Sequence, residues 1–442
     1  MALGIGYGLP FVAQHGTNPY KKQWAAALEG AKGAGATVED ENAGTGSCLV
    51  ARGQEAYTDG LPATPSLLIV PQFYKAGNLY QDVPPFVAED STMRFTVSRN
   101  TTATRVNSSG LIESVASGVP RIDWLGQSCP ALLVEASGQN QALWSRDLSV
   151  SGTWAASGIT AVRNAVGADG TASGATTLTS TAASATITQN ISHASQSRIF
   201  SAYMRRVSGT GQIELTTNGG TNWQTVTLTS AFASFNSGAQ TVASGQVGIR
   251  MIASGDVIEV DFTQAEIGPI ATSPIPTTVA AVSRAADLIS ASGALVSGLI
   301  GQTEGTLYLE MQANAAGTGT AILIVGNASS NYIYIGKDSN RMRVRVRIGN
   351  VNAVDNQDTI LNGSPLKIAV AYQQSGNCAA YVNGNFLVSG TAGNFSAALT
   401  GIGLTDKASL PFDTISAINR IRAAALYTTR LTDAQLAELT RL

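Results

Sequence analysis

Aromatic side chains beside amide side chains are the residues of this chain best suited to hold a ligand. Trp223 directly follows Asn222 and lies close to the glycine pair Gly219-Gly220, so we expect it at the edge of a loop. A sugar ring can stack on an aromatic ring while nearby amide groups bond its hydroxyls. The other candidates for such stacking are Trp144, Trp154, Tyr203, Tyr332 and Tyr334. Because only 6% of the chain is aromatic, packing in a core or an interface is the competing interpretation for each ring.

Side chains that could break a bond are scarce. Glu259 and Asp261 alternate on one strand face, with Glu266 further on, and a glycosidase needs such a pair of carboxylates. Polar side chains on the solvent face of a strand would also explain this spacing. His15 and His193 are the only histidines, and no phosphate-binding loop, nucleophile elbow or zinc motif occurs. We therefore predict that the protein is not an enzyme and has no catalytic residue, cofactor or metal ion.

Charge and hydropathy exclude several classes of protein. The 442-residue chain has a formal net charge of −2 and only 13% charged residues, which argues against a basic nucleic-acid binder. Its 46 glycines, together with many Ser and Thr residues, indicate short strands joined by tight turns. No run of about 18 apolar residues occurs, and the N-terminus lacks the basic and apolar regions of a secretory signal. We expect neither membrane insertion nor export through such a signal.

The sequence pattern predicts a mainly β protein, with a small α+β N-terminal region followed by two antiparallel β-sandwich domains of the jelly-roll type. We assign residues 1–90 to the N-terminal region and 91–137 to a β-hairpin connector. Strands recur roughly every 10 to 12 residues over 138–272, which is typical of a jelly roll. The proline-containing segment 273–300 is predicted to be a linker. A second series of strands predicts another sandwich over 301–442.

Local signals mark three further elements. The pattern around Trp24 within residues 20–60 predicts one short amphipathic helix. Asn383-Gly384 favours a tight hairpin, because a type I′ turn needs positive φ at both central residues. Thr432 and Gln435 are spaced as a capping box at the start of a final helix.

An arginine-rich strand lies in the second predicted sandwich. Arg343, Arg345 and Arg347 alternate with apolar residues and therefore share one strand face. This face could bind an anion or simply be solvated. A Ca²⁺ ion held near Asp338 and Asn340, or near Asp355 and Asp358, is the alternative to the predicted absence of metal.

Several motifs in a fixed order together resemble a module of tailed-bacteriophage structural proteins. The first group consists of Ala103–Val106, Gly110–Ile112, Val119–Asp123, Leu132–Glu135 and Trp154. The second consists of Ser273–Asp287, the segment from Lys367 to Asn385, and the final LTDAQLAEL. The resemblance covers roughly residues 94–442. This chain has Gly138-Gln139-Asn140 where that family usually has Arg-Thr-Asn.

The resemblance implies a carbohydrate-binding-like jelly roll followed by a concanavalin A-like or laminin-G-like sandwich. It further implies a virion protein of the head-fibre, decoration, tail-fibre or tail-tip type, located in the virion. Its expected partners are other copies of itself in a homotrimer, other virion proteins through residues 1–90, and host-surface glycan, with no nucleic acid. The alternatives are a free-standing bacterial lectin-like protein and a depolymerising tailspike, although no fixed β-helix repeat occurs.

Overall fold

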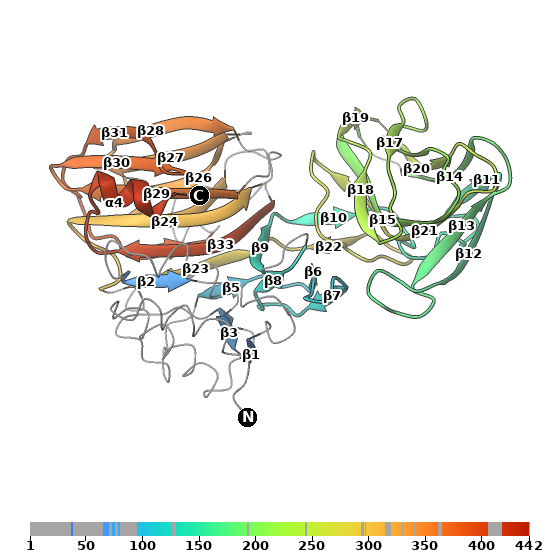
Figure 1. The fold of residues 1–442 in the computed structure, drawn as a ribbon, viewed down its shortest axis with the longest axis horizontal. Coiled ribbons are helices and arrows are strands. Elements are labelled where there is room, and N and C mark those ends of the chain that lie inside the picture. The colour runs from blue at the N-terminus through green and yellow to red at the C-terminus, as the bar shows by residue number, and fades with distance from the viewer. Residues whose placement is uncertain are drawn as a thin grey trace, which may run out of the picture. The chain divides into compact units, whose positions relative to one another are not determined.

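Strands dominate both parts of the chain, which confirms the predicted mainly β fold (Figure 1). The computed structural model describes residues 37–38, 65–69, 73–75, 78–79, 95–125, 130–191, 194–243, 245–292, 296, 298–313, 320–328, 330–338, 341–360, 365–404 and 418–441. The helix predicted within residues 20–60 lies outside these ranges. Within that segment the structure describes only strand β1 (Thr37–Val38). Within the described part, no helix is long and apolar enough to span a membrane.

Two compact units divide the chain, and neither is continuous in sequence. Unit 1 comprises residues 1–99, 118–136 and 287–442. Unit 2 comprises residues 100–117 and 137–286.

Unit 1 contains two large antiparallel sheets. The strands of the first are, in order, β31 (Asn385–Thr391), β30 (Asn377–Val382), β29 (Pro365–Gln373), β24 (Glu304–Ala313), β33 (Ile418–Tyr427), β9 (Ala131–Glu135) and β8 (Arg121–Asp123), with β2 (Leu67–Ile69) beside β33. Those of the second are β28 (Val351–Ile360), β27 (Arg341–Ile348), β26 (Asn331–Asp338), β25 (Thr320–Ala328), β32 (Gly401–Gly403), β23 (Leu288–Ser292) and β5 (Thr96–Ser98). β1, β3 (Phe73–Lys75) and β4 (Asn78–Leu79) form a small third sheet.

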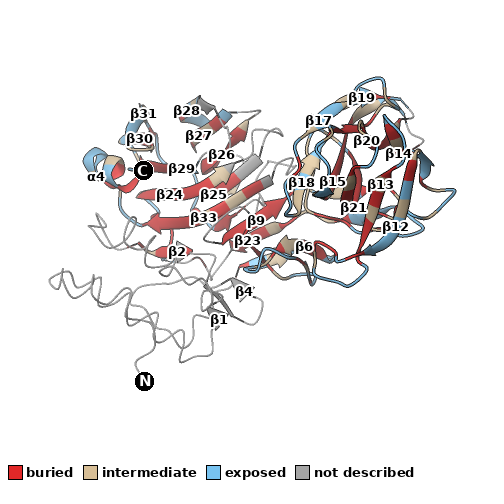
Figure 2. Cartoon of the chain, turned by 45° about the vertical axis from the view of Figure 1, so that its right-hand side comes forward, coloured by how far each residue is buried: buried red, intermediate tan, exposed pale blue. Residues whose placement is uncertain are grey.

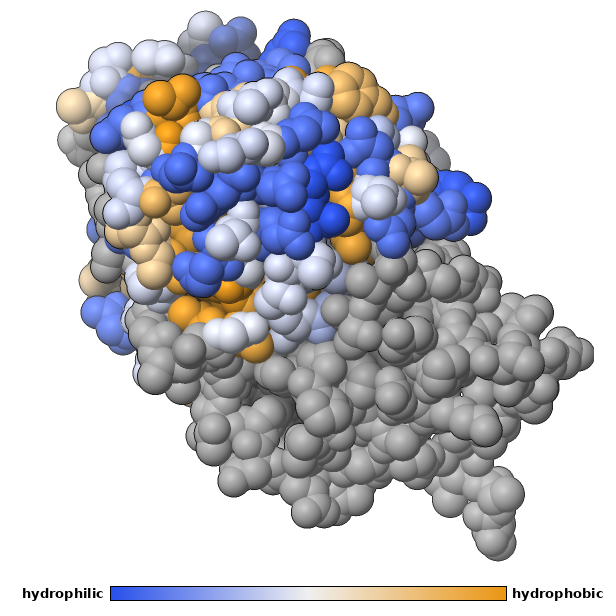
Figure 3. All heavy atoms as spheres, turned by 90° about the vertical axis from the view of Figure 1, so that its left-hand side faces the viewer, coloured by the Kyte–Doolittle hydropathy of each residue, from blue (hydrophilic) through white to orange (hydrophobic). Residues whose placement is uncertain are grey.

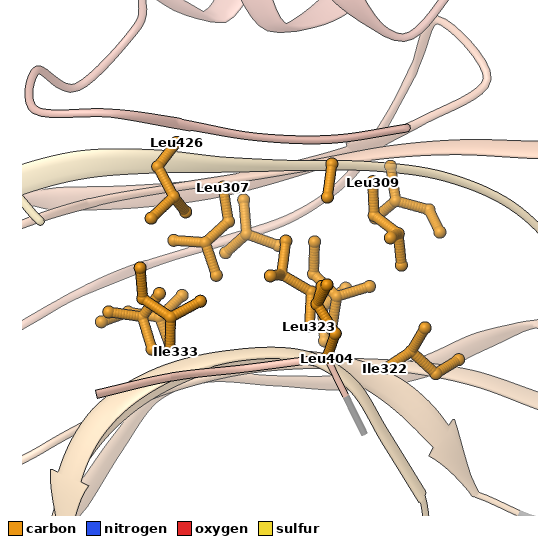
Figure 4. Close-up of a cluster of buried hydrophobic side chains, with 14 of the residues drawn as sticks. Leu307, Leu309, Ile322, Leu323, Ile333, Leu404 and Leu426 are labelled. Atoms are coloured by element: carbon orange, nitrogen blue, oxygen red, sulfur yellow. The ribbon is translucent and has the colours of Figure 1, made fainter. Parts of the chain in front are cut away.

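The core of unit 1 fills the space between its two large sheets (Figure 4). Leu307 and Leu426 point from the first sheet towards Leu323 and Ile333 of the second (Figure 4). Period-2 alternation produces this arrangement, because every second residue of a strand faces the same side. In Figure 2, buried positions follow β24 and β33 of this unit.

A short helix covers part of the outer face of the first sheet. α4 (Asp433–Leu439) packs Leu436 and Leu439 against alanines of β29 and β33. Thr432 and Gln435 form the predicted capping box, and the Asn383-Gly384 turn has the predicted positive φ angles of 50° and 79°. Figure 3 shows one side of unit 1, on which hydrophilic side chains outnumber scattered hydrophobic ones among the described residues.

Unit 2 is a second sandwich. Its five-stranded sheet has the order β11 (Ala155–Ser157), β14 (Ala185–Asn190), β20 (Gln246–Met251), β16 (Ile213–Thr216), β17 (Gln224–Val226). Its six-stranded sheet contains β12 (Ile159–Ala165), β13 (Ala175–Ser180), β21 (Val257–Ile267), β15 (Gln196–Ser208) and β18 (Ala233–Asn236), with β19 (Gln240–Val242) beside β15. Two short pairs complete it, namely β6 (Ala103–Val106) with β7 (Ile112–Val115), and β10 (Gly138–Asn140) with β22 (Val282–Arg284).

The segments expected to be a connector and a linker are strands of the two units. Within 91–137, β5, β8 and β9 extend the large sheets of unit 1, whereas β6 and β7 belong to unit 2. Within 273–300, β22 belongs to unit 2 and β23 to unit 1. The reason is long-range pairing: Leu132 of β9 lies opposite Ile421 of β33, a partner that no local pattern reveals.

Asn140, the last residue of the segment Gly138-Gln139-Asn140, has a structural role. Its side-chain Nδ2 donates to the carbonyls of Thr263 and Ile275 at 2.9 and 2.8 Å. Its Oδ1 accepts from the backbone N–H groups of Ala142 and Ala265 at 3.0 Å each. This fully buried amide therefore joins three backbone segments within unit 2.

Four charged side chains form a buried cluster inside unit 1. Arg121 on β8 donates from Nη1 to Glu135 on β9 at 2.7 Å and from Nη2 to Asp287, the residue before β23. Arg99, the residue after β5, donates to the other oxygen of Asp287 at 2.6 Å. Each of the four residues is at most 1% exposed. Burial acts to lower the pKa of Arg121, but the carboxylates of Glu135 and Asp287 raise it above its ordinary value, so the guanidinium stays charged.

Backbone hydrogen bonds tie the same segments together. The N–H of Asp287 donates to the carbonyl of Glu135 at 3.0 Å, and the N–H of Glu135 donates to Oδ2 of Asp287 at 3.0 Å. Nη2 of Arg99 donates to the carbonyl of Val119 at 3.0 Å. The cluster therefore specifies which strands meet at this edge of the two sheets.

Asp287→Ala should destabilise unit 1 strongly. The substitution removes the carboxylate that both Arg99 and Arg121 contact, in a place where all three side chains are buried. We expect a loss of about 3–5 kcal/mol in the free energy of unfolding. Unfolding in urea, monitored through hydrogen exchange of the backbone amides of β8, β9 and β23, measures this loss of stability.

The control for this variant is Glu438→Ala. It removes an exposed ion pair with Arg441 at 2.6 Å and should cost less than about 1 kcal/mol. Equal stability of the two variants would contradict the role assigned to the cluster.

Candidate functional site

The five-stranded sheet of unit 2 presents a polar outer face. Alternate residues of β16 and β20 point into the core, which leaves Glu214, Thr216 and Arg250 on the outer side. Glu214 lies directly opposite Arg250 in the sheet register. The hairpin register of β16 and β17 brings Trp223, the residue before β17, beside Thr216.

Trp223 is held by an ion pair. The guanidinium carbon of Arg250 lies 4.4 Å from the centroid of the Trp223 ring. Nε of Arg250 donates to Glu214 at 2.5 Å, and Nη2 is paired with the same carboxylate. Glu214 is buried, and its other oxygen accepts from Nε2 of Gln212 at 3.0 Å. Glu214 therefore compensates the charge of Arg250, and the planar guanidinium braces one face of the half-buried indole.

The loop before Trp223 is organised by its own polar atoms. Oγ1 of Thr216 accepts from the N–H groups of Asn218 and Gly220 at 3.3 and 3.2 Å. Oδ1 of Asn218 accepts from the N–H of Asn222 at 2.9 Å, and the side chain of Asn222 is exposed. A Cβ on Gly220 would come within 3.0 Å of the indole Nε1 of Trp223. A glycine here lets the loop approach the indole.

Next to the indole, the sheet presents small and amide side chains. The register places Gly248 between Thr188 and Thr216, so this position carries no side chain on the outer face. At the next position along, Nε2 of Gln246 donates to Oδ1 of Asn190 at 3.0 Å. The face thus offers one braced aromatic ring with hydroxyl and amide groups around it, which is the chemistry that recognises a sugar.

Three other candidate rings of unit 2 lie elsewhere. Trp144 is partly buried and packs against the core of the unit. Trp154 is only 3% exposed, belongs to the core, and donates from Nε1 to the carbonyl of Leu143 at 3.1 Å. Tyr203 lies on β15 of the six-stranded sheet, where its ring meets Phe262 edge to face with centroids 6.3 Å apart. Trp223 and Asn222 are therefore together, whereas Trp154 has no free face and Tyr203 is on the other sheet.

The two tyrosine candidates of unit 1 are buried. Tyr332 and Tyr334 on β26 are 2% and 3% exposed and pack with Ile324. The hydroxyl of Tyr332 accepts from Nη1 of Arg345 at 2.9 Å. Burial raises the pKa of Tyr334 well above its ordinary value. Neither ring offers an exposed face for a sugar.

Four of the carboxylates considered for catalysis or Ca²⁺ binding are engaged by arginines. A fifth, Glu266, accepts from Oγ1 of Thr272 at 2.7 Å. Glu259 pairs with Arg205 at 2.5 Å, and Asp261 pairs with Arg146 at 2.8 Å. Asp338 and Asp355 both pair with Arg343, at 2.7 and 2.8 Å. Among the side chains that the structure describes, no group of three or more His, Cys, Asp or Glu residues could hold a metal ion.

The sequence pattern singled out Trp223, but it did not reveal the ion pair of Arg250 and Glu214 that contacts its ring. Glu214 and Arg250 each sit at an alternating position of an apolar strand, which predicts only that they face outward. Their pairing depends on β16 and β20 being neighbours, although 36 residues separate the two side chains in sequence. No local signal could have joined them to Trp223.

Comparison with known proteins identifies no family. No family model matches the sequence, and no curated protein matches it. Among solved structures, the binding domain of Botulinum neurotoxin DC in complex with rat synaptotagmin II is 14% identical, with a TM-score of 0.29, and the match covers 35% of this chain and 40% of that one. The Ruminococcus gnavus IT-sialidase CBM40 is 12% identical, with a TM-score of 0.28 and coverage of 34% and 88%. A leech intramolecular trans-sialidase is 15% identical, with a TM-score of 0.29 and coverage of 34% and 26%.

Gly220→Ala and Gly219→Ala should differ in their effect on Trp223. Both glycines have positive φ angles, 88° and 70°, so alanine costs about 1–2 kcal/mol of backbone strain at either position. The new methyl group would meet the indole at 3.0 Å only in Gly220→Ala, because the nearest atom to a Cβ on Gly219 is 3.6 Å away. Tryptophan emission should therefore shift in Gly220→Ala and not in Gly219→Ala. An identical spectrum for the two variants would show that the loop does not position the ring.

Proposed function

We propose that unit 2 binds a carbohydrate on the outer face of its five-stranded sheet. The observation that carries this proposal is the half-buried Trp223 ring, braced by the ion pair of Arg250 and Glu214 beside a sheet face of hydroxyl and amide groups. The brace keeps the ring in one orientation before a ligand arrives, which lowers the entropic cost of binding.

The same contacts indicate a neutral sugar. Glu214 already compensates the charge of Arg250, so an acidic sugar would gain little from the guanidinium and would lie near a carboxylate. Asn222 and Gln224 are exposed beside the ring and can bond hydroxyls. Binding there needs no bond to be made or broken, which is the chemistry of an adhesin rather than an enzyme.

Trp223→Ala should abolish this binding. We expect at least an about tenfold loss of affinity for the best neutral glycan identified on an array with the full chain, since a central tryptophan commonly dominates such a contact. Titration calorimetry measures the loss, and Trp223→Phe should restore part of it.

Phe232→Ala is the matched control. Phe232 is a half-buried ring under Arg205, whose guanidinium carbon is 4.6 Å from its centroid, on the other sheet of the same unit. Its loss should leave glycan affinity unchanged. An array without any neutral glycan signal, or equal effects of the two variants, would overturn the proposal.

We also propose that the protein is a non-enzymatic structural component of a tailed-bacteriophage virion that adheres to the host surface. The support is the ordered series of motifs from Ala103 to the C-terminal helix. Three motif residues, Arg121, Glu135 and Asp287, build the buried cluster of unit 1, so the motifs have a structural purpose in this fold. In this proposal residues 1–90 attach the chain to other virion proteins, and a homotrimer multiplies weak binding per site.

Cryo-electron microscopy and mass spectrometry of purified particles test the virion proposal. The chain should be present at a fixed copy number, in trimeric appendages on head or tail with residues 1–90 against the particle. A chain absent from particles and monomeric in solution would refute it and favour a free-standing lectin. Release of oligosaccharides from a bound polymer would favour a depolymerising tailspike instead.

A further inference from the structure

The outer face of β26, β27 and β28 in unit 1 carries a row of arginines. Arg341, Arg343, Arg345 and Arg347 occupy every second position of β27, opposite the buried Met342, Val344, Val346 and Ile348. Successive guanidinium groups therefore start about 7 Å apart along the strand. The neighbouring strands contribute Asp338 from β26 and Asp355 from β28 to the same face.

The two carboxylates of this face are already fully engaged. Arg343 donates to both oxygens of Asp355, at 2.8 and 3.0 Å, and to Asp338 at 2.7 Å. Arg345 shares Asp355 at 2.9 Å, and Asn352 donates to it at 3.0 Å. These contacts hold the middle of the row in place. Neither Asp338 nor Asp355 is bonded to the side chains of Arg341 and Arg347 at the two ends.

The ends of the row lack an acidic partner. The exposed side chain of Arg341 makes no hydrogen bond or ion pair with a residue that the structure describes. Arg347 donates only to the neutral Oδ1 of Asn352, at 3.1 Å, and its Nε is buried without an acceptor. Among the side chains of this face that the structure describes, four guanidinium groups stand against two carboxylates, which leaves two positive charges in excess. The chain as a whole has a formal net charge of −2.

We propose that this arginine row binds a linear acidic polysaccharide, whose charged groups contact Arg341 and Arg347 at the two ends. A polymer with charges repeating along its length matches a row of fixed guanidinium groups, because each can bond an anionic oxygen in a planar, directed way. A single-stranded nucleic acid fits less well, since Tyr332 and Tyr334 are buried and cannot stack with bases. The surface lies in a different unit from Trp223 and does not depend on the neutral-sugar proposal.

Binding of the full chain to dextran sulfate, polygalacturonate and neutral dextran tests the inference. In the Trp223→Ala variant, which removes the proposed neutral-sugar site, the two acidic polymers should bind and neutral dextran should not. Binding of the acidic polymers should weaken steeply between about 0.05 and 0.5 M salt because the contacts are partly exposed. The double variant Arg341→Ala/Arg347→Gln should bind dextran sulfate at least about tenfold more weakly. Arg347→Lys, which keeps the charge, should retain part of the affinity that Arg347→Gln loses.

Arg441→Ala is the control for net charge. Arg441 is an exposed arginine of the same unit, paired with Glu438 away from the row, and its loss should leave polymer binding unchanged. Trp223→Ala should also bind dextran sulfate normally, which separates this inference from the neutral-sugar proposal. Equal weakening by Arg441→Ala, binding of neutral dextran by Trp223→Ala as tight as that of the acidic polymers, or binding of a thymidine oligonucleotide without binding of either acidic polymer would overturn the inference. Thermal unfolding of each variant verifies that the fold is intact.

Discussion

The buried network of Arg99, Arg121, Glu135 and Asp287 is the interaction on which the architecture of unit 1 depends. Burying a carboxylate or a guanidinium is costly unless an opposite charge lies beside it and its hydrogen-bonding groups have partners. Each member of the network is therefore tolerated only when the others are present. The chain leaves unit 1 after Arg99 and Ala136 and returns at Gly118 and Asp287. Charged members of the network therefore stand at or near every point where the chain leaves or re-enters this unit. Hydrophobic residues of similar size could fill the same space, but they would not distinguish one strand partner from another.

Arginine has two contrasting uses in this protein. In unit 2, Arg146, Arg205 and Arg250 are each paired with a carboxylate and each cover an aromatic ring, at 4.3, 4.6 and 4.4 Å from the ring centroid. Such arginines are rigid parts of the sheet surface, because the carboxylate fixes the guanidinium and compensates its charge. On β27, Asp338 and Asp355 pair with Arg343 and Arg345 in the middle of the row. Neither carboxylate is paired with Arg341 or Arg347 at the ends. The same residue type thus braces a ring in one unit and leaves free charge in the other.

The two binding chemistries proposed for this chain would together suit adhesion to a heterogeneous surface. A neutral-sugar site gains its selectivity from shape and hydrogen bonds, whereas a charged row gains speed and reach from electrostatic attraction that salt weakens. Each contact would be weak alone. Several copies of the chain on one particle would combine them into firm attachment, because the second binding event then occurs at a high effective concentration.

The local sequence determined the elements of this protein, and tertiary structure determined how they were combined. Alternation along β27, the Asn383-Gly384 turn and the Thr432 capping box were predictable because each depends on neighbours a few residues apart. The membership of β8, β9 and β23 in the sheets of unit 1 was not, since their partners are distant in sequence. The loop beside it made Trp223 the preferred candidate from the sequence, but only the structure showed that Trp154, Tyr332 and Tyr334 are buried. Whether an aromatic ring or an arginine is free or engaged is set by which distant side chain packs against it, and that is information only the folded chain contains.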